Sequence, residues 1–303
     1  MSTEEGDVHK NSWISCLILL VAGPLFGAEL FFSERDADQI SRALPDGSSE
    51  QVVLSGLDSP QKLCVDDVNR HLYWVESGAQ ILARSSLTGN DPVILVEDLG
   101  GVTSVALDLA NGKLYWVSAW GYIARSNLDG SAEETLITGL GAPQDLALDL
   151  TTGKMYWGNL NEGKLQRSNL DGTEIEDLAT GVSPSGVTLD LVAQKIYWSD
   201  QNSDKIVWAD IDGSNAVDLI AVTNPNGLAI DHGAGKLYWV NSNSLSRADL
   251  DGSNPETLLT GLAVGRGVAF DFRDAVFADD FESGSMNAWS NASFLSVASG
   301  TDN

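Results

Sequence analysis

The chain has 303 residues, of which 43% are hydrophobic and 8% are aromatic. This composition supplies enough apolar side chains for a folded core and excludes a largely disordered chain. Asp and Glu number 43 against 17 Lys and Arg, a net charge of −26, and a surface this acidic repels phosphate backbones. A nucleic-acid-binding function is therefore excluded.

The first feature along the chain is the apolar run Trp13–Gly23, which is followed by Pro24 and the small residues Gly27 and Ala28. A run of this length before small residues is typical of an export signal and is short for a bilayer span. Its N-terminal flank is more acidic than basic, which leaves a buried helix or a misplaced start codon as alternatives. We predict a signal peptide at residues 1–28 and a secreted, periplasmic or cell-surface protein, with no membrane span in the mature chain.

Three short motifs then recur along the chain with the same period and in the same order. The first is an aromatic pair, at spacings of 42, 42, 41, 41 and 41: Phe31-Phe32, Tyr73-Trp74, Tyr115-Trp116, Tyr156-Trp157, Tyr197-Trp198 and Tyr238-Trp239. The second is a turn after each pair: Asp46-Gly47, Thr88-Gly89, Asp129-Gly130, Asp171-Gly172, Asp212-Gly213 and Asp251-Gly252. The third is an apolar run ending in an aspartate: Asp66, Asp108, Asp149, Asp190, Asp231 and Asp271. The chain therefore contains six copies of one repeat.

One period reads as four short strands separated by Gly, Asn and Asp, as in LALD, KMYW, KLQRSNL and EIEDL. Adjacent Tyr and Trp point to opposite faces of a strand, so both faces of the sheet must be covered. A blade of a β-propeller meets this need because it lies between two neighbours, and units of 40–45 residues with four strands are typical of propellers.

The number of predicted strands also accounts for the closure of the ring. The first copy begins at its second strand, Glu29–Ser33, and lacks an innermost strand, whereas the last copy is followed by a surplus innermost strand, Gly267–Asp271. We predict that this surplus strand completes the first blade and removes an open sheet edge. The result is an all-β, six-bladed propeller over residues 29–272, with a tail at 273–303 outside the ring.

These residues resemble a known family. The KIYWSD strand at Lys195–Asp200, the Asp-Gly-Ser turns and the P-x-G-L-A-x-D segment at Pro225–Asp231 are similar to the YWTD β-propeller, the class B repeat domain of the low-density lipoprotein receptor family. The resemblance implies the six-bladed fold and a role in binding protein ligands. The disulfide-rich modules of the animal receptors have no counterpart, since Cys64 is the sole cysteine after residue 28. The tail is similar to segments near the C-termini of secreted bacterial proteins.

In a propeller, the loops that lead into the innermost strands share one face with the loops between the second and third strands. We expect one residue of each repeat to lie at the mouth of the central channel on that face: Gln61, Thr103, Gln144, Ser185, Asn226 and Arg266. Trp120 and Tyr122 add aromatic side chains to an outer loop of the face. An exposed Trp near an Arg is typical of a protein-binding hot spot, although Trp120 could instead pack on its own loop.

Catalysis has weaker support. His71 and His232 fall in turns of the opposite face, so no Ser or Cys at the channel has a histidine partner, and Cys64 is expected in the core. A site for a divalent cation such as Ca²⁺, as in six-bladed lactonases, has the weak candidates Asp58, Asp145 and Asn226. We expect no cofactor, with Ca²⁺ as the alternative.

A set of arginines recurs at one position of the third strand, with Trp208 in the remaining copy: Arg42, Arg84, Arg125, Arg167 and Arg247. Because they lie one per blade, we expect each to bond a carboxylate of its own blade rather than to form a basic stripe. Eleven of the 43 acidic residues likewise belong to the repeated turns, so their presence needs no partner.

The sequence therefore favours an exported, monomeric, non-enzymatic module that binds a protein or a small molecule at the mouth of the channel. A metal-dependent hydrolase, lactonase or lyase is the first alternative, and a structural surface repeat protein is the second.

Overall fold

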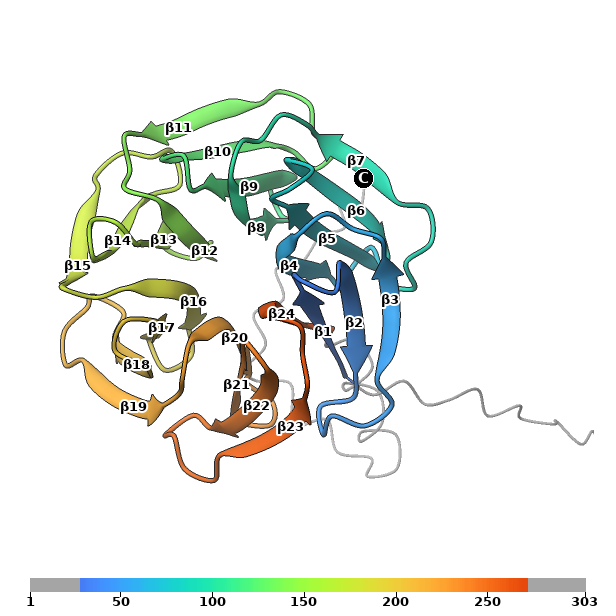
Figure 1. The fold of residues 1–303 in the computed structure, drawn as a ribbon. Coiled ribbons are helices and arrows are strands. Elements are labelled where there is room, and N and C mark those ends of the chain that lie inside the picture. Colours follow the sequence, from blue (N-terminus) through green and yellow to red (C-terminus); the bar gives the residue numbers. More distant parts are fainter. Residues whose placement is uncertain (1–27, 272–303) are drawn as a thin grey trace, which may run out of the picture.

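The computed structural model describes residues 28–271, so the predicted signal peptide, apart from Ala28, and the predicted tail lie outside the described residues. The described part folds into six antiparallel four-stranded sheets arranged around a central axis (Figure 1). This confirms the prediction of an all-β, six-bladed propeller. Between residues 28 and 271 there is no helix of the length and hydrophobicity that a membrane span needs.

Each blade has four strand positions, from the innermost to the outermost, and each set runs from blade 1 to blade 6. The innermost strands are β24 (Gly265–Asp271), β4 (Pro60–Asp66), β8 (Val102–Asp108), β12 (Pro143–Asp149), β16 (Pro184–Asp190) and β20 (Pro225–Asp231). The second strands are β1 (Glu29–Glu34), β5 (His71–Glu76), β9 (Lys113–Ser118), β13 (Lys154–Asn159), β17 (Lys195–Asp200) and β21 (Lys236–Asn241). The third strands are β2 (Gln39–Ala43), β6 (Ile81–Ser86), β10 (Tyr122–Asn127), β14 (Lys164–Asn169), β18 (Lys205–Asp210) and β22 (Ser244–Asp249). The outermost strands are β3 (Gln51–Ser55), β7 (Val93–Val96), β11 (Glu134–Thr138), β15 (Glu176–Thr180), β19 (Val217–Ala221) and β23 (Glu256–Thr260).

Blade 1 joins the two ends of the described chain. Its strand order is β24-β1-β2-β3, and β24 pairs with β1 through partners such as Leu30 and Phe270. Figure 1 shows the red strand β24 beside the blue strand β1. The predicted completion of the first blade by a C-terminal innermost strand is confirmed, and β24 covers the edge of β1 that would otherwise be unpaired.

The aromatic pairs form the contacts between blades. Each Tyr packs in a cluster with the Trp of the following blade, as Tyr73 does with Trp116 and Tyr156 with Trp198. The tryptophans and tyrosines in these pairs are almost completely buried. The alternation of the strand thus places the two rings of one pair in two different interfaces, which explains why the repeat needs both.

Phenylalanines replace this pair in blade 1. Phe31 takes the place of Tyr and packs with Trp74 of blade 2, and Phe32 takes the place of Trp and packs with Tyr238 of blade 6. Phe270 of β24 adds an edge-to-face contact with Tyr238, with ring centroids 4.7 Å apart. The interface between the first and last blades is therefore as aromatic as the other five.

The repeated aspartates are used in turns. In the Asp-Gly turns the carboxylate accepts bonds from the residue two positions later, as Asp129 does from the backbone nitrogen of Ser131 at 2.9 Å and from its hydroxyl at 2.6 Å. At the ends of the innermost strands, Asp66 accepts bonds from the backbone nitrogens of Val68 and Asn69. The interpretation of these carboxylates as turn residues is confirmed for Asp66 and Asp129, whereas Asp271 instead accepts a bond from Arg70 Nη1 at 2.7 Å.

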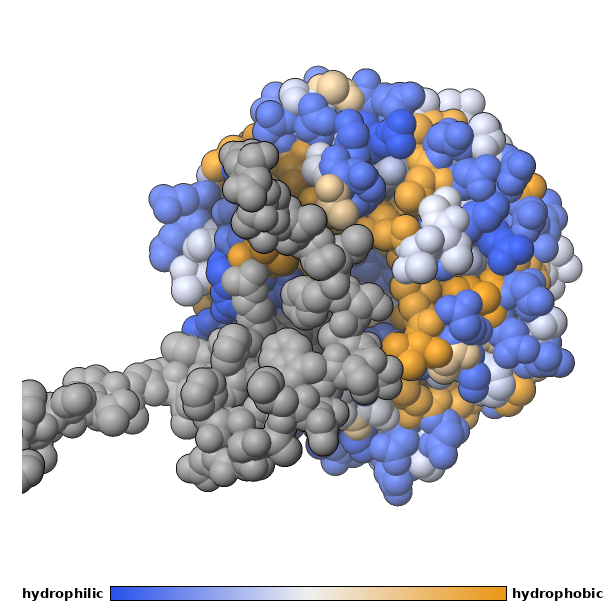
Figure 2. All heavy atoms as spheres, turned by 180° about the vertical axis from the view of Figure 1, so that it is seen from behind, coloured by the Kyte–Doolittle hydropathy of each residue, from blue (hydrophilic) through white to orange (hydrophobic). Residues whose placement is uncertain are grey.

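The surface follows the order of the strands. The outermost strands carry mostly exposed or half-buried residues, whereas the second strands are almost entirely buried. Figure 2 shows one face of the ring, on which hydrophilic residues cover most of the outer edge and hydrophobic residues gather nearer the middle. The outermost strands therefore meet solvent, whereas the second strands belong to the core between the blades.

Candidate functional site

The start of each innermost strand defines the face that we call the mouth face. Pro60, at the start of β4, pairs with Glu76 at the end of β5, and Glu76 pairs with Ile81 at the start of β6. Loops that lead into innermost strands and loops between second and third strands therefore share this face, as expected. The six predicted mouth residues all occupy the second position of an innermost strand, and we call them the mouth ring: Gln61, Thr103, Gln144, Ser185, Asn226 and Arg266.

Three members of the mouth ring join neighbouring blades. Thr103 Oγ1, Ser185 Oγ and Asn226 Nδ2 each donate to the carbonyl of the first residue of the next innermost strand, at 3.2, 2.7 and 3.0 Å. These donors are therefore not available to a ligand without loss of a contact between blades.

Two further members bond to loops of their own blade. Gln61 Nε2 donates to the carbonyl of Ser59 at 3.1 Å and to Ser77 Oγ at 2.9 Å, and Gln144 Nε2 donates to the carbonyl of Ala142 at 3.2 Å. Five of the six mouth residues thus make bonds that hold the rim of the channel in shape. These five residues therefore form a rigid polar ring around the opening of the channel.

Arg266 is the exception. Its Nη1 lies 3.4 Å from Asn226 Oδ1, and its Nε is buried without a hydrogen-bond partner among the described residues. Burial, followed by the nearby charge of Arg35, lowers the pKa of the Arg266 guanidinium. A buried donor that lacks an acceptor is costly, so Arg266 is the member of the ring that is best placed to receive a ligand.

At the third residue of each innermost strand, which follows the mouth ring, the two halves of the propeller carry different residue types. Blades 2, 3 and 4 carry Lys62, Ser104 and Asp145, whereas the other three blades carry glycine: Gly186, Gly227 and Gly267. A Cβ on Gly186 would lie 2.0 Å from the carbonyl oxygen of Asn226, so the glycine half lets neighbouring strands approach closely. The polar half instead places the side chains of Lys62, Ser104 and Asp145 in the channel.

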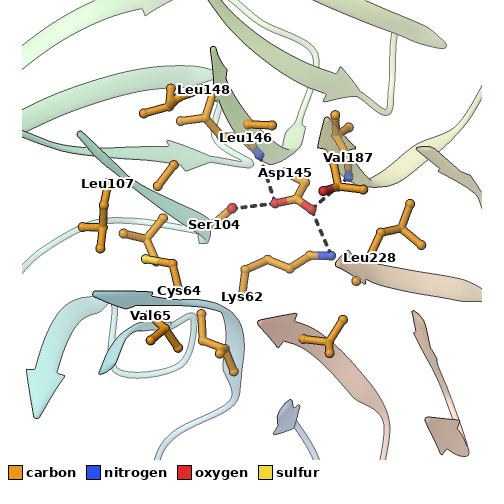
Figure 3. A pocket seen from close by; sticks show the side chains of 17 residues that line it. Lys62, Cys64, Val65, Ser104, Leu107, Asp145, Leu146, Leu148, Val187 and Leu228 are labelled. Atoms are coloured by element: carbon orange, nitrogen blue, oxygen red, sulfur yellow. Dashed lines mark hydrogen bonds and ion pairs between the residues drawn. The ribbon is translucent and has the colours of Figure 1, made fainter. Parts of the chain in front are cut away.

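Asp145 is the centre of this polar half (Figure 3). Its Oδ1 accepts from Ser104 Oγ at 2.7 Å and from the Leu146 backbone nitrogen at 3.0 Å, and its Oδ2 accepts from the Val187 backbone nitrogen at 3.0 Å. Lys62 Nζ lies 3.3 Å from Oδ2 as an ion pair. The carboxylate is thereby fully used as an acceptor.

Lys62 is less well satisfied than its partner. Its side chain is 11% exposed, and its ammonium makes no hydrogen bond of good geometry to the described residues. Burial is the main cause of a lowered pKa for Lys62, which the charge of Asp145 only partly opposes. The ammonium borders a cavity of about 300 Å³ in the channel, whose walls include Leu63, Leu146 and Leu228.

Trp120 lies on an outer loop of the mouth face, between β9 and β10. Its side chain is 72% exposed, and its indole covers Gly100 so closely that a Cβ there would lie 1.9 Å from Trp120 Cζ3. Tyr122 does not join it, because Tyr122 is half-buried and packs on the core cluster that contains Trp116. The two predicted aromatic residues therefore lie in different environments.

The weak candidates for a metal site have different neighbours. Asp58 is exposed on a loop and covers Gly78, whereas Asp145 is held in the channel by Lys62. Asn226 has its oxygen bonded to Gln201 Nε2 at 2.8 Å and its nitrogen bonded to Gly265. Within residues 28–271 there is no group of three or more His, Cys, Asp or Glu side chains that could hold a metal ion.

Cysteine and histidine likewise form no nucleophilic site in the described part. Cys64 lines the channel cavity, and burial raises the pKa of its thiol, which favours the unreactive protonated form. His232 follows the last residue of β20, at the opposite end from the mouth, and its Nδ1 lies 3.6 Å from Asp190 Oδ1. Neither group meets a hydroxyl nucleophile.

Four of the five repeated arginines bond a carboxylate of their own blade, as predicted, whereas Arg84 stands opposite Val93, which offers none. Three of the four also donate to a backbone carbonyl of the next blade: Arg125, Arg167 and Arg247. Arg125, Arg167 and Arg247 each contact a glutamate on the adjacent outermost strand: Glu134, Glu176 and Glu256. Arg42 bonds Glu29 of its own blade at 3.2 Å, and the ring of Trp208 is covered by Lys195 Nζ at 3.4 Å from its centroid. These groups form no continuous basic surface.

Known proteins share both the repeat and the ring. The family described as low-density lipoprotein receptor repeat class B matches residues 194–232, which span β17 to β20. Residues 194–232 are thus similar to a class B repeat. The six-bladed propeller that the aromatic pairs of the sequence predict is also the fold of the similar solved structure described next.

Solved structures have the same architecture. A chain of the crystal structure of a nidogen/laminin complex matches with a TM-score of 0.74 and 22% identity, covering 81% of this chain and 98% of that one. TolB from Acinetobacter baumannii matches with a TM-score of 0.67 and 14% identity, covering 82% of this chain and 67% of that one. No curated protein matches the chain by sequence.

Sequence reasoning missed Lys62, because it considered only the second position of each innermost strand. The signal is present one residue later. Opposite charges, Lys62 and Asp145, stand at the same register position of two repeats in otherwise apolar strands. A comparison of the third position across all six copies would have found the pair.

Proposed function

We propose that the chain is an exported, non-catalytic binding module whose mouth face contacts a protein partner. The observation that carries this proposal is Trp120, a large aromatic side chain that is 72% exposed on that face. Export is supported by the apolar run Trp13–Gly23 followed by small residues. The proposed module needs no cofactor.

The neighbours of Trp120 hold it in an exposed position, as is expected of a residue that contacts a partner. Its indole rests on the backbone of Gly100 and its backbone nitrogen bonds Ser118 Oγ at 3.1 Å, so the ring is positioned before any partner arrives. A partner that covers a preorganised ring gains the burial energy without a large cost in side-chain entropy. Trp is also the residue type that most often dominates the binding energy of an interface.

The comparisons support the same class of function. The nidogen/laminin structure, which is named as a complex of two proteins, shares the six-bladed architecture over most of this chain. The similarity of residues 194–232 to a class B repeat also supports this function. The alternative of a metal-dependent hydrolase gains no comparable support, since the amide of Asn226 and the carboxylate of Asp145 are already bonded within the protein.

The proposal is tested with variants that alter one face at a time. Partners of the wild-type chain are identified by affinity capture, and the affinity of the main partner is then measured for Trp120→Ala, Gly100→Ala and Val192→Ala. Gly100→Ala keeps the indole but displaces it, and Val192 is a control because it is 84% exposed in the turn between β16 and β17 on the opposite face. We expect at least a tenfold loss for both mouth-face variants and less than a twofold change for Val192→Ala. Unchanged affinity for Trp120→Ala would contradict the proposal.

A further inference from the structure

One cross-strand pair of the repeat is chemically matched in five blades and mismatched in blade 2. The pair joins a residue of the third strand to the first residue of the outermost strand. In four blades an arginine faces a side chain that can accept its hydrogen bonds: Arg42 and Gln51, Arg125 and Glu134, Arg167 and Glu176, Arg247 and Glu256. Blade 5 replaces both members, so that Trp208 faces Val217. Blade 2 combines the arginine of one kind with the valine of the other, because Arg84 faces Val93.

This mismatch removes from Arg84 the acceptor that its counterparts have. Residues directly opposite each other on antiparallel strands point to the same face of the sheet. Val93 therefore stands at the position from which Glu134 reaches Arg125 at 2.8 Å in blade 3. Among residues 28–271, Arg84 takes part in no ion pair.

The other neighbours of Arg84 position it without replacing a glutamate. Burial raises the pKa of the Tyr73 hydroxyl, and the guanidinium of Arg84 beside it partly opposes this. On blade 3, hydrogen bonds from Ser131 and then the charge of Arg84 lower the pKa of Asp129, but its carboxylate is bonded to Ser131. Arg125 has the same two kinds of neighbour in addition to its glutamate. Arg84 thus lacks one partner of a set that is otherwise complete.

The strand beside Arg84 is apolar and exposed. β7 reads VILV, whereas the outermost strand of each of blades 3 to 6 carries an acidic residue. Val93 is 46% exposed and Ile94 is 51% exposed, and as consecutive residues they point to opposite faces of the strand. β7 is also the last strand of its blade, so one of its edges has no strand beside it. Exposed edges usually carry charges that discourage association, and β7 carries none.

The charges restrict what could cover this edge. A guanidinium without an acidic partner is complementary to a carboxylate, and the two groups can share two parallel hydrogen bonds. The net charge of −26 repels a strongly acidic protein at a distance. The complementary ligand is therefore a mainly apolar segment with a single acidic side chain, and not an acidic run.

We propose that the outer edge of blade 2 binds an extended, mainly apolar segment of a partner protein that carries one Glu or Asp. Its carboxylate bonds Arg84 as Glu134 bonds Arg125, and its apolar side chains cover Val93 and Ile94. This site goes beyond the proposed function, because it lies on an outermost strand and requires neither Trp120 nor the mouth ring.

The test selects ligands for the full chain from a phage-displayed library of random decapeptides. The library is first depleted on folded Arg84→Gln chain and is then selected on the wild-type chain, so that peptides for other surfaces are removed. We expect enriched sequences with one acidic residue among apolar residues. Replacement of that residue by its amide in the synthetic peptide should weaken binding about tenfold, the effect of losing a charge-assisted bond. No enrichment, or enriched peptides without an acidic residue, would overturn the proposal.

Val93→Glu provides a second and independent variant. It supplies the missing carboxylate from the protein's own strand, as blades 3, 4 and 6 do, so it should fold like the wild type and weaken binding of the selected peptide about tenfold. Val217→Glu is the matched control, because Val217 is 44% exposed at the same position but faces Trp208, and it should leave the affinity unchanged. Circular dichroism shows whether each variant is folded. Unchanged affinity in folded Val93→Glu would overturn the assignment to Arg84.

Sedimentation and Trp120→Ala separate the remaining outcomes. The wild-type chain should sediment as a monomer at micromolar concentration. A dimer that Arg84→Gln dissociates would mean that a second copy covers the edge, and the inference of a separate partner would be wrong. Trp120→Ala should bind the selected peptide as the wild type does, so failure of the mouth-face proposal and failure of this one are separate results.

Discussion

Lys62 Nζ lies 3.3 Å from Asp145 Oδ2, although the two residues belong to blades 2 and 4, which are not neighbours. Ser104 of the blade between them donates to the same carboxylate at 2.7 Å. Three consecutive blades are therefore joined across the channel rather than only through their side interfaces. Because both charged side chains are nearly buried, each depends on the other to offset its desolvation.

Loss of the carboxylate should be the more damaging change to this pair. Asp145→Ala leaves Lys62 buried without a counter-charge, and we expect the free energy of unfolding to fall by about 3–5 kcal/mol. Lys62→Met should cost less, because Asp145 keeps its bonds from Ser104 and two backbone nitrogens. Urea denaturation of each variant measures the difference.

The double variant Lys62→Met/Asp145→Leu provides the control for that comparison. It removes both charges, so it should be more stable than Asp145→Ala alone. A double variant at least as unstable as Asp145→Ala would show that packing, and not the ion pair, sets the cost.

Titration of Tyr197 should lower the free energy of unfolding in alkaline solution. Burial, followed by the charges of Asp190 and Asp251, raises the pKa of Tyr197 to about 12. An unfolded tyrosine ionises near pH 10, so between about pH 10 and 12 the folded state binds more protons and the free energy of unfolding falls as pH rises.

Tyr197→Phe removes this titration and should flatten the fall in stability between those pH values. At pH 7 the variant should lose about 1 kcal/mol, because the bond from Tyr197 Oη to the Leu250 carbonyl at 3.3 Å is lost. Urea denaturation at several pH values, with absorbance at 295 nm to follow phenolate formation, measures both effects. An unchanged pH dependence would show that other groups control alkaline unfolding.

Truncation of an aromatic side chain where the ring closes should destabilise the fold as much as truncation at any other interface between blades. Phe32 is completely buried between blades 1 and 6, so Phe32→Ala should lower the free energy of unfolding by about 3–5 kcal/mol. Trp198→Ala, at a regular interface, should cost a similar amount. Thermal or urea unfolding compares them, and a cost below about 1 kcal/mol at Phe32 would mean that the chain ends do not hold the ring together.

Calcium titration separates the binding module from its enzymatic alternative. We expect no stoichiometric heat when Ca²⁺ is added to the chain, because a hard cation requires several oxygen ligands including carboxylates and the described channel offers only Asp145, already paired. Tight binding that is abolished by Asp145→Ala or Asn226→Ala would instead favour a metal-dependent site.

The fold could be predicted because its physical causes repeat. An aromatic pair occurs in every blade because it fills two interfaces, and a glycine preceded by Asp or Thr occurs wherever the same turn is made, so six copies with one period identify the propeller. The surplus strand at Gly265–Asp271 was recognisable because blade 1 lacked one.

The sequence predicts which residues lie at the mouth of the channel, but it does not predict their hydrogen-bond partners. The sequence places Thr103 and Ser185 at the mouth, yet their bonds go to carbonyls of the next blade, and the distance between neighbouring backbones is not encoded locally. Tyr122 was grouped with Trp120 by sequence proximity, whereas the strand turns it onto the core. The pairing of Lys62 with Asp145 depends on the channel being narrow enough for a lysine to cross, which only the closed ring determines.

Binding of ligands on the mouth face is tested most directly by photocrosslinking. A photoreactive amino acid is introduced at position 120 on the mouth face or at position 192 on the opposite face, and each chain is irradiated with extract from the source cells. We expect a discrete adduct from position 120 that an excess of unlabelled wild-type chain suppresses, and no such adduct from position 192. A suppressible adduct from position 192 alone would contradict binding on the mouth face.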